Sequence, residues 1–326
     1  MHKQTYSGAI LEGFEYLLDN YSEVMIMGQG LWSPWYVGNS MKDLDVRYGK
    51  HRIYDTPVSE AACTGAAVGA SIAGSRVIVV HPRMDFMLYA MDPIVNQAAK
   101  WSYMFNGTSK ARCTIRAIVN RGGEQGPQHS QSLHSIFAHV PGLRVVAPST
   151  VSDARDLLIS SVLSDDPVMY IDDRWLYEQE SMVKPPKPTK LEDIDQQILV
   201  SGNDITIAGT GYGTYLARQA ASSLSTRSLS AEVVDVRVLN PYRPEILLQS
   251  VAKTGRLVVV DCSWPQCSIS SEILASLVES LEPGHLREKP VRINLPPIPA
   301  PSATALESYF YPDVDSVVQK CLSILV

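Results

Sequence analysis

Apolar and polar positions in the first half of the chain follow two different periods. Apolar residues recur at helical spacing from Ile10 to Leu18, which predicts an amphipathic helix. Residues 31–49, rich in tryptophan, proline and glycine, predict a loop with a short helix. Short apolar runs predict strands at 24–27, 76–80, 113–119, 143–146 and 167–171, and helices are expected at 61–74, 88–105 and 152–163. Strands that alternate with helices predict a mostly parallel sheet covered on both faces.

A change of composition divides the chain. Residues 179–195 contain Lys184-Pro-Pro-Lys-Pro188 and scattered charges with little to bury, which predicts a linker. Beyond it, apolar runs at 205–208, 231–236 and 257–261 predict the strands of a second, smaller domain. The expected fold class is therefore α/β with two domains, at 1–178 and 196–326.

The run Gly209-Thr-Gly-Tyr-Gly213 follows a predicted strand and invites a dinucleotide-binding interpretation. Its third glycine is wrongly spaced for the G-x-G-x-x-G pattern, and no clear acid stands at the position that would bind a ribose. The dinucleotide hypothesis is therefore weak.

The stretch from Asp55 to Glu60 introduces a helix of unusual composition. Thr56 can cap this helix, and Pro57 lacks the donor that a first helical residue leaves unpaired, so Glu60 is expected in or near the first turn. The helix itself, 61–74, has almost no polar side chain and contains three glycines. Each glycine destabilises a helix by roughly 1 kcal/mol relative to alanine, so the composition predicts a buried helix that another backbone or a ligand approaches closely.

Local pattern leaves two interpretations of Glu60 open. Glu60 can be an ordinary first-turn acid stabilised by the helix dipole. It can also be a desolvated acid with a raised pKa, held for proton transfer. His129 is equally ambiguous, because it follows the glycine-rich run 122–128 that lets backbone come near a ligand, yet a surface loop histidine would look the same.

Composition narrows the functional classes. The chain has 326 residues, 45% of them hydrophobic, and a net charge of −6 without a Lys/Arg cluster, which argues against nucleic-acid binding. Five cysteines without a close CxxC pair indicate reduced thiols, and Cys262 and Cys267 lack the further ligands of a metal site. Neither a signal peptide nor a run of transmembrane length is evident, so a soluble cytoplasmic protein is expected.

Several long motifs in one chain carry a family resemblance. From about Tyr6 to its C-terminus, the chain resembles the beta subunit of the thiamine diphosphate-dependent decarboxylase component of pyruvate, branched-chain and acetoin dehydrogenases. This transketolase-like family implies a pyrimidine-binding domain and a C-terminal domain that serves mainly in subunit association. The motifs are His51-Arg-Ile-Tyr-Asp-Thr-Pro-Val-Ser-Glu60, Asp92-Pro-Ile-Val-Asn-Gln-Ala-Ala-Lys100, Gln128-His-Ser-Gln131 and Ala138-His-Val-Pro-Gly-Leu-Arg-Val-Val146.

The resemblance implies roles for three residues. Glu60 would bond the N1' atom of the cofactor's aminopyrimidine, Phe86 would pack on that ring, and His129 would act on the substrate. A carboxyl group at N1' favours the imino tautomer that removes the thiazolium C2 proton, and each pKa unit of mismatch costs about 1.4 kcal/mol. An aromatic wall and a histidine that titrates near neutral pH suit the other two roles.

The resemblance also implies that this chain is half of an enzyme. Thiamine diphosphate requires Mg²⁺, which the family binds through Gly-Asp-Gly and a downstream Asn, and this sequence has no Gly-Asp-Gly. In the two-chain family the alpha subunit supplies the metal site, so no residue of this chain is assigned to the metal. The implied associations are an alpha-type partner, an alpha2beta2 assembly and a lipoyl acyltransferase.

Several positions depart from the family pattern. Gln29 and His134 stand where acids are usual, Ile118 where proline is usual, and Arg83 where an apolar or small residue is commoner. Trp264-Pro-Gln-Cys267 replaces a glycine-rich turn. The cofactor site is thus retained while its surroundings differ, which leaves the substrate and the acceptor open.

Two arginines are candidates for binding the substrate. Arg83 and Arg121 could bind an anionic or phosphorylated small molecule, and the alternative is that both are ordinary structural or surface arginines. 

The expected activity is decarboxylation of a 2-oxo acid with transfer of the acyl unit to a lipoyl carrier. One alternative is a split transketolase or acyloin-forming enzyme that passes a two-carbon or acyl unit to an aldehyde or sugar. The segments 96–100 and 128–131 favour the dehydrogenase type. A further alternative is a noncatalytic scaffold, against which the retention of Glu60, Phe86 and His129 argues.

Overall fold

The computed structural model describes residues 1–33 and 36–325, and these form two compact units. The first unit comprises residues 1–120 and 136–194, and the second comprises residues 121–135 and 195–326. The segment 121–135, which contains His129, therefore groups with the C-terminal half of the chain, and nothing in the sequence indicated this. The domain boundaries expected at 178 and 196 stay a prediction.

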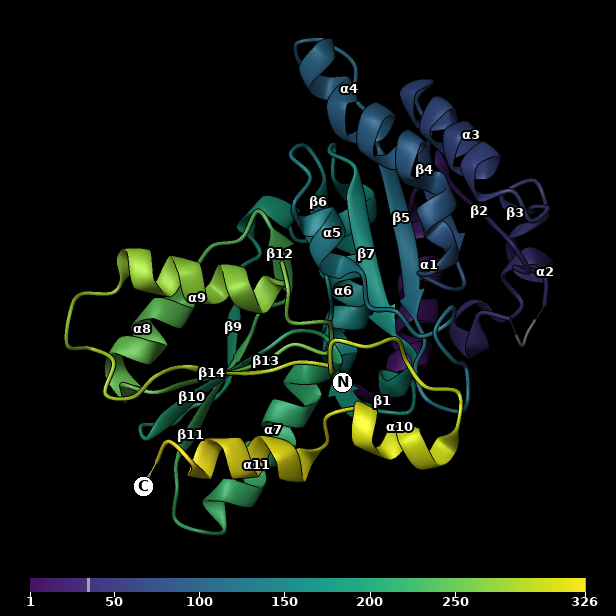
Figure 1. The fold of residues 1–326 in the computed structure, drawn as a ribbon. Coiled ribbons are helices and arrows are strands. Elements are labelled where there is room, and N and C mark those ends of the chain that lie inside the picture. The colour runs from purple at the N-terminus through teal and green to yellow at the C-terminus, as the bar shows by residue number, and fades with distance from the viewer. Residues whose placement is uncertain (34–35, 326) are drawn as a thin grey trace. The chain divides into compact units, whose positions relative to one another are not determined.

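A parallel sheet forms the centre of the first unit, as the alternation of strands and helices predicts (Figure 1). The six strands that this unit contributes lie in the order β6-β7-β5-β4-β2-β3, and every neighbouring pair among them is parallel. They are β2 (Val24–Gly28), β3 (Ile53–Asp55), β4 (Arg76–His81), β5 (Cys113–Val119), β6 (Arg144–Val146) and β7 (Val168–Asp173). The five predicted strands are confirmed, and β3 was not predicted.

Three long helices accompany this sheet. Both α1 (Tyr6–Asn20) and α6 (Val151–Leu163) begin after a threonine whose side chain caps the first turn, and the two helices pack against each other. The third, α3 (Glu60–Ile72), packs against β4. The loop expected at 31–49 contains η1 (Gly38–Met41) and α2 (Leu44–Tyr48), and shorter turns form at η4 (Arg174–Leu176) and η5 (Leu191–Asp193).

The helix predicted at 88–105 is confirmed as a helical segment, but it is not a regular α-helix. The chain forms a 3₁₀ turn, η2 (Phe86–Ala90), a π-helix, η3 (Asp92–Ala98), and a short α-helix, α4 (Ala99–Met104). Pro93 stands in the first turn of η3, where it removes one N–H donor from the helical ladder. The π-helix therefore begins where the regular pattern of α-helical hydrogen bonds would be interrupted. The spacing of apolar residues does not reveal such a local change.

A two-stranded antiparallel ribbon ties the N-terminus to the predicted linker. In it β1 (His2–Thr5) pairs with β8 (Glu180–Val183), with His2 opposite Val183 and Thr5 opposite Glu180. Most side chains of both strands are exposed or half-buried, so the pairing is held by backbone bonds. The sequence predicted only a linker at 179–195. It did not reveal β8 because this strand lacks the alternation of apolar and polar residues that marks a half-buried strand.

A fully buried ion pair lies in the first unit. The guanidinium of Arg116 donates to both carboxylate oxygens of Asp172, at 2.9 and 2.7 Å, and also to Ser40 and Tyr177. Burial alone would lower the pKa of Arg116, but the adjacent Asp172 carboxylate raises it above its ordinary value. This fork-to-fork pair joins β5 to β7 inside the sheet.

The second unit has its own five-stranded sheet, in the order β14-β13-β10-β11-β9. All neighbouring pairs are parallel except β11 and β9. The runs predicted near 205, 231 and 257 are confirmed as strands, whereas β9, β12 and β14 were not predicted. The strands of this sheet are β9 (Gln197–Val200), β10 (Ile205–Gly209), β11 (Ala231–Asp235), β13 (Leu257–Val260) and β14 (Val291–Ile293), and the short strand β12 (Val238–Asn240) is not part of it.

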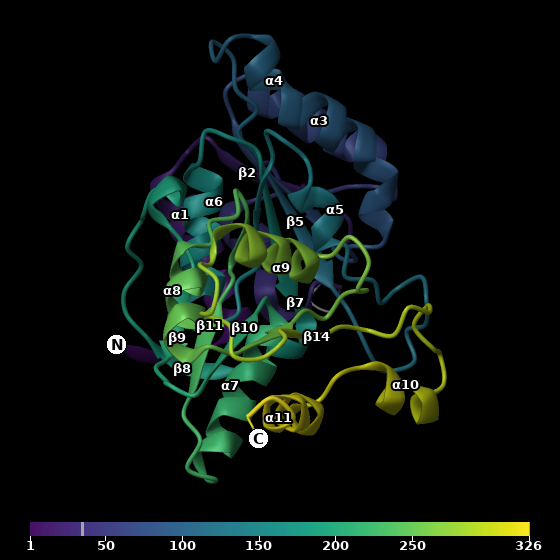
Figure 2. The same ribbon diagram turned by 60° about the vertical axis from the view of Figure 1, so that its left-hand side comes forward.

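Helices cover both faces of this second sheet. Figures 1 and 2 show α8 and α9 on one side of it and α7 with α11 on the other. The core between α7, α11 and the strands consists of small and branched apolar residues such as Ile207, Leu216 and Val317. The helices are α7 (Tyr212–Ser225), α8 (Glu245–Thr254), α9 (Ile269–Ser280), α10 (Thr304–Phe310) and α11 (Val314–Leu322). None of the helices in the described residues has both the length and the apolar character that a membrane span needs.

The glycines of the run 209–213 serve close packing. A Cβ atom at Gly213 would lie 2.2 Å from the carbonyl oxygen of Val260, and one at Gly209 would lie 2.5 Å from the backbone nitrogen of Thr214. Thr214 in turn donates its hydroxyl to Asp235 at the end of β11. Strand and helix contacts therefore account for these glycines without a dinucleotide.

Candidate active site

A pocket opens where three neighbouring strands of the first unit end. In the register of the sheet, Gly28 at the end of β2 lies opposite Asp55 at the end of β3 and opposite Val80 in β4. Parallel α/β sheets bind ligands at this edge. The pocket is lined by Gly28, Gln29, Tyr36, Thr56, Pro57, Ser59, Glu60, Cys63, Val79, Val80, His81, Pro82, Arg83 and Phe86.

Backbone contacts fix the shape of this pocket. The N–H of Gly30 donates to the Asp55 carboxylate at 2.6 Å, and the N–H of Thr56 donates to the carbonyl of Gly28 at 2.9 Å. A Cβ atom at Gly28 would lie 2.5 Å from the carbonyl oxygen of Val80, so only glycine lets β2 end this close to β4. These contacts hold the entry to α3 beside the pocket.

Glu60 is the first residue of α3 and lines the pocket. Its expected place in the first turn is confirmed, but the expected cap is wrong. Ser59, not Thr56, precedes the helix, and its side chain makes no capping bond. Pro57 also lies outside the helix, because β3 ends at Asp55 and residues 56–59 make the turn that brings Glu60 to the pocket.

The expectation that the small-residue helix is buried is wrong for the single chain. One face of α3 is buried, through Thr64, Ala67, Val68 and Ser71, while the face that carries Gly65 is exposed. Added Cβ atoms at Gly65 and Gly69 would meet nothing within 4 Å. This chain therefore does not itself supply the close neighbour that these glycines suggested.

Phe86 and Arg83 reach the same pocket as Glu60 from the turn after β4. The N–H of Phe86 bonds to the carbonyl of Arg83, which begins η2, and Val79 and Val80 add apolar wall. The structure thus brings together three of the five residues selected from the sequence. It also places Gln29 on the same wall.

Arg83 is held in a cationic corner of the pocket. Burial lowers its pKa, as does the nearby Arg174 guanidinium, while Tyr36 and Asp85 oppose this effect. The Nη1 atom of Arg83 is buried without a hydrogen-bond partner, and so is the Nε atom of Arg174. Arg174 donates its Nη2 to the carbonyl of Tyr36, whose hydroxyl accepts a bond from Gln29 at 3.0 Å. Unused donors and positive charge meet here.

His129 and Arg121 belong to the second unit, in the segment 121–135. Arg121 is 7% exposed and lies over the ring of Tyr212, with 5.6 Å from its guanidinium carbon to the ring centroid. His129 is half-buried, and its N–H bonds to the carbonyl of Gly126. The backbone before it turns through four residues of positive φ, namely Gly122, Gly123, Glu124 and Gly126.

The N-terminal part of this segment is tied to α10. The N–H of Gly122 donates to the Tyr311 hydroxyl at 3.2 Å, and the N–H of Glu124 donates to Glu307 at 2.9 Å. Thr304 donates its hydroxyl back to the Glu124 carboxylate at 2.9 Å. These hydrogen bonds anchor the part of the segment that precedes His129 to α10 and the residue after it.

Comparison with known protein families decides the classification. Residues 2–179 match the transketolase pyrimidine-binding domain, and residues 195–317 match the transketolase C-terminal domain. The chain belongs to the transketolase-like family. The resemblance drawn from the motifs is thereby confirmed, and so is the two-domain α/β class.

Relatives within this thiamine diphosphate-dependent family are beta subunits. The acetoin:2,6-dichlorophenolindophenol oxidoreductase subunit beta of Cupriavidus necator is 38% identical over 272 residues, 83% of this chain and 80% of the relative. The mitochondrial pyruvate dehydrogenase E1 component subunit beta of Ascaris suum is 35% identical over 289 residues, 87% of this chain and 80% of the relative. The chain is thus a beta-type subunit of a thiamine diphosphate-dependent decarboxylase component, as expected from the sequence.

A solved structure shares the fold of this transketolase-like chain. The split gene transketolase, described as an inactive beta4 tetramer, superposes with a TM-score of 0.77 and covers 98% of this chain and 96% of its own. Its sequence identity is 20%, so this likeness supports the fold alone.

Sequence reasoning missed one buried side chain of the pocket in this family member. His81, the last residue of β4, is 3% exposed, and its Nε2 lies 3.2 Å from the hydroxyl of Thr64 in α3. Burial lowers the pKa of His81 to about 4, so the ring is neutral at physiological pH. Its position after an apolar strand, at the edge where ligands bind, was the signal that could have identified it.

No group of three or more His, Cys, Asp and Glu side chains within residues 1–33 and 36–325 is arranged to hold a metal ion. The groups around the pocket fit an organic cofactor instead: the Glu60 carboxyl group, the rings of Tyr36 and Phe86, apolar walls and a backbone cradle that a Cβ at Gly28 would fill. This set suits an aminopyrimidine, which is flat and carries polar edges.

Proposed function

We propose that this chain is the beta-type half of a two-chain enzyme that decarboxylates a 2-oxo acid and passes the acyl unit to a lipoyl carrier. One observation carries the proposal: Glu60 and Phe86 line one pocket at the strand edge where such a family binds its cofactor. When bound, thiamine diphosphate supplies a carbon nucleophile and an electron sink for the loss of carbon dioxide.

Glu60 would hold a proton at the N1' atom of the aminopyrimidine. Its place at the first residue of α3 fixes the backbone of the carboxyl group, and the wall beside it is apolar. Phe86 would lie against the pyrimidine face and exclude water from it. Both residues act by holding and orienting, which suits side chains that reach a pocket from rigid elements.

His129 would exchange a proton with the substrate. An imidazole can both donate and accept a hydrogen bond, and the turn after Gly126 presents this half-buried ring from a segment anchored at its N-terminal end. Proton exchange at a fixed position requires such anchoring.

Arg83 would bind an anionic group of the substrate. Its buried Nη1 has no partner in the described residues, and its position beside Glu60 puts this donor in the cofactor pocket. Arg121 is a second candidate, although its stack on Tyr212 also gives it a structural role. A carboxylate or phosphate accepts two parallel bonds from such a guanidinium.

An alpha-type partner would complete the enzyme in an alpha2beta2 assembly. The partner would bring Mg²⁺ and its ligands for the diphosphate, and it would cover surfaces such as the exposed small-residue face of α3. A lipoyl acyltransferase would be the next partner. We place the complex in the cytoplasm, since the five cysteines of the described residues are all unpaired.

A split transketolase or acyloin-forming activity is the second candidate function. The cationic corner around Arg83 and Arg174 favours it, because a phosphorylated sugar or aldehyde acceptor would satisfy both unused donors. A noncatalytic scaffold is less consistent with a pocket that keeps both Glu60 and Phe86.

Purification of the native complex, followed by peptide sequencing, tests the proposal. The expected result is a partner that carries Gly-Asp-Gly with a downstream Asn. The reconstituted pair should then release carbon dioxide from 2-oxo acids, and the release should require added thiamine diphosphate and Mg²⁺. Product formation with a lipoyl protein supports the dehydrogenase, and product formation with aldehyde acceptors supports the second candidate. Failure of both with every copurified partner would refute a catalytic role.

A further inference from the structure

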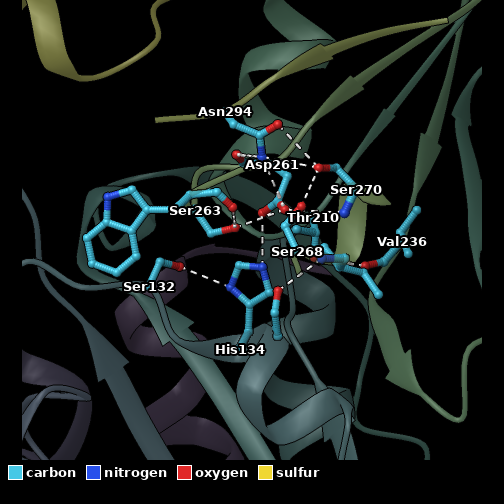
Figure 3. Close-up of polar contacts among 12 residues, drawn as sticks. Ser132, His134, Thr210, Val236, Asp261, Ser263, Ser268, Ser270 and Asn294 are labelled. Carbon is cyan, nitrogen blue, oxygen red and sulfur yellow. Dashed lines mark hydrogen bonds and ion pairs between the residues drawn. The ribbon is translucent and has the colours of Figure 1, made fainter. Parts of the chain in front are cut away.

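A buried histidine and a buried carboxylate join the segment 121–135 to the end of β13. His134, the first residue of α5 (His134–Ala138), places Nε2 2.9 Å from Oδ1 of Asp261 (Figure 3). The His134 side chain is 6% exposed and that of Asp261 is 0% exposed. Their positions differ by 127 residues, so the contact joins two distant parts of the chain within the second unit.

The other carboxylate contacts come from neutral groups. Oδ2 of Asp261 accepts a bond from the Ser263 hydroxyl at 2.9 Å and longer contacts from the Ser270 N–H and the Asn294 amide, at 3.4 and 3.5 Å. Figure 3 shows these groups around the carboxylate, opposite the imidazole. His134 is therefore the one basic side chain that contacts Asp261 in the described residues, and an isolated buried carboxylate is unfavourable.

The imidazole of His134 uses both ring nitrogens. Because a carboxylate only accepts, Nε2 must carry the hydrogen toward Asp261. Nδ1 lies 3.0 Å from the hydroxyl of Ser132, three residues after His129. Ser135, the residue after His134, accepts a bond from the N–H of Ile269 in α9 at 2.9 Å. Contacts at residues 132, 134 and 135 thus fix the chain shortly after His129.

We propose that His134 and Asp261 are positioning residues that fix the backbone on the C-terminal side of His129, as α10 fixes it on the N-terminal side. Their catalytic consequence rests on the proposed function of His129. His129 lies between the two anchors, beside the exposed residues Pro127 and Gln128. The C-terminal domain would thereby set the position of a proton-exchanging histidine.

A histidine suits this buried position better than an acid would. An acid at position 134 would put a second carboxyl group against Asp261, so that the two would have to share a proton. The imidazole of His134 instead donates a hydrogen bond to the carboxylate. Position 134 is therefore a buried contact and not a surface site.

The test uses His134→Leu, His134→Gln and the double variant His134→Leu/Asp261→Asn, each reconstituted with the alpha-type partner. His285, an exposed histidine of the same unit, gives the control His285→Leu. The leucine variant should lower kcat about 100-fold, since a displacement near 1 Å has that effect, with KM nearly unchanged. Gln keeps a donor toward Asp261 and should restore most of kcat.

The double variant separates positioning from stability. Asn removes the unpaired charge while it still accepts bonds from Ser263, so the midpoint of thermal unfolding should recover toward that of the wild type. A kcat that stays low in this stable variant supports positioning. Recovery of kcat together with the midpoint would show a purely structural role and overturn the proposal.

Hydrogen exchange on the chain without its partner gives a readout that needs no activity. Amides of residues 121–135 should exchange roughly tenfold faster in His134→Leu than in the wild type, and those of the α7 core should not change. Unchanged exchange would overturn the anchoring itself. If the reconstituted wild type shows no thiamine-dependent turnover, the proposed function fails while this exchange result still decides the anchor.

Discussion

The pocket of the first unit and the buried pair His134 and Asp261 of the second unit differ in how their polar groups are bonded. In the pocket, Glu60 and Phe86 are partly exposed, and Arg83 keeps an unused buried donor. His134 and Asp261 are buried, and both ring nitrogens and both carboxylate oxygens have partners within the chain. Groups that must bind a ligand keep unused donors, whereas groups that fix a loop are bonded within the chain.

This difference separates function from stability. A group with no partner in the chain contributes little to folding, so its loss should affect binding or turnover alone. A buried pair that is fully bonded contributes through the penalty of leaving one member behind, so its loss should affect the free energy of unfolding. The predictions below test the two sides of this comparison.

Replacing Glu60 by Gln should give the largest effect. The amide cannot hold and return a proton at the aminopyrimidine, so kcat of the reconstituted enzyme should fall by roughly 1,000-fold or more, with the urea midpoint unchanged. Glu245, a first-turn acid of α8, gives the matched control Glu245→Gln. Full activity in Glu60→Gln would contradict the catalytic role of Glu60 and favour the noncatalytic scaffold.

The opposite behaviour is expected at the buried pair of the first unit. Arg116→Leu should lower the free energy of unfolding by about 3–5 kcal/mol, because Asp172 is then buried without its partner. Urea denaturation followed by circular dichroism measures this loss. Arg47→Leu, at a pair on the surface, should cost at most about 1 kcal/mol. Equal losses in the two variants would contradict the role given to burial.

His81 lines the pocket yet should behave like a structural group. Its folded-state pKa of about 4 lies below the ordinary 6.5, so the unfolded chain binds the proton first as the pH falls. The contribution of the neutral His81 ring to the free energy of unfolding is present above pH 6.5 and is lost progressively as the pH falls toward 4. Between pH 7 and pH 5 this loss should be about 2 kcal/mol.

Denaturation of the wild type and of His81→Gln at both pH values checks the assignment. Gln keeps a bond to Thr64 but does not titrate. Between pH 7 and pH 5, the free energy of unfolding should therefore fall by about 2 kcal/mol less in His81→Gln than in the wild type. The exposed His51 supplies His51→Gln, whose pH dependence should match the wild type. A slope that His81→Gln leaves unaltered would mean that another group titrates.

Arg83→Gln should give the smallest effect. KM for an anionic substrate should rise about tenfold through the loss of one charge-assisted bond, with unfolding unaffected or slightly more difficult as Arg174 loses a repelling neighbour. Arg227→Gln, at an exposed arginine, is the control. An unchanged KM in steady-state kinetics would remove Arg83 from substrate binding.

Sequence reasoning succeeded where one stretch or one strand edge decides the structure. The strand ends place Glu60, Arg83 and Phe86 in one pocket because parallel strands bring their following turns to one edge. It failed where distant parts decide. From the sequence, His134 was only a departure from the family pattern. Its partner Asp261 follows β13, 127 residues later, and no local pattern links the two positions.

The burial of α3 failed for a different reason. Small residues indicate close packing, but they do not say which molecule supplies the neighbour, and the single chain leaves the Gly65 face exposed. The π-helical hydrogen bonding within the helix at 88–105 depends on how Pro93 is placed in its turn, and apolar spacing carries no information on that placement.

The ribbon of β1 and β8 has a consequence for the order of events during synthesis. On the ribosome β1 emerges before its partner β8, which follows roughly 10 to 35 s later at about 5–20 residues per second. Through that interval β1 is an open strand edge without its partner. This strand is therefore among the last in its unit to be paired.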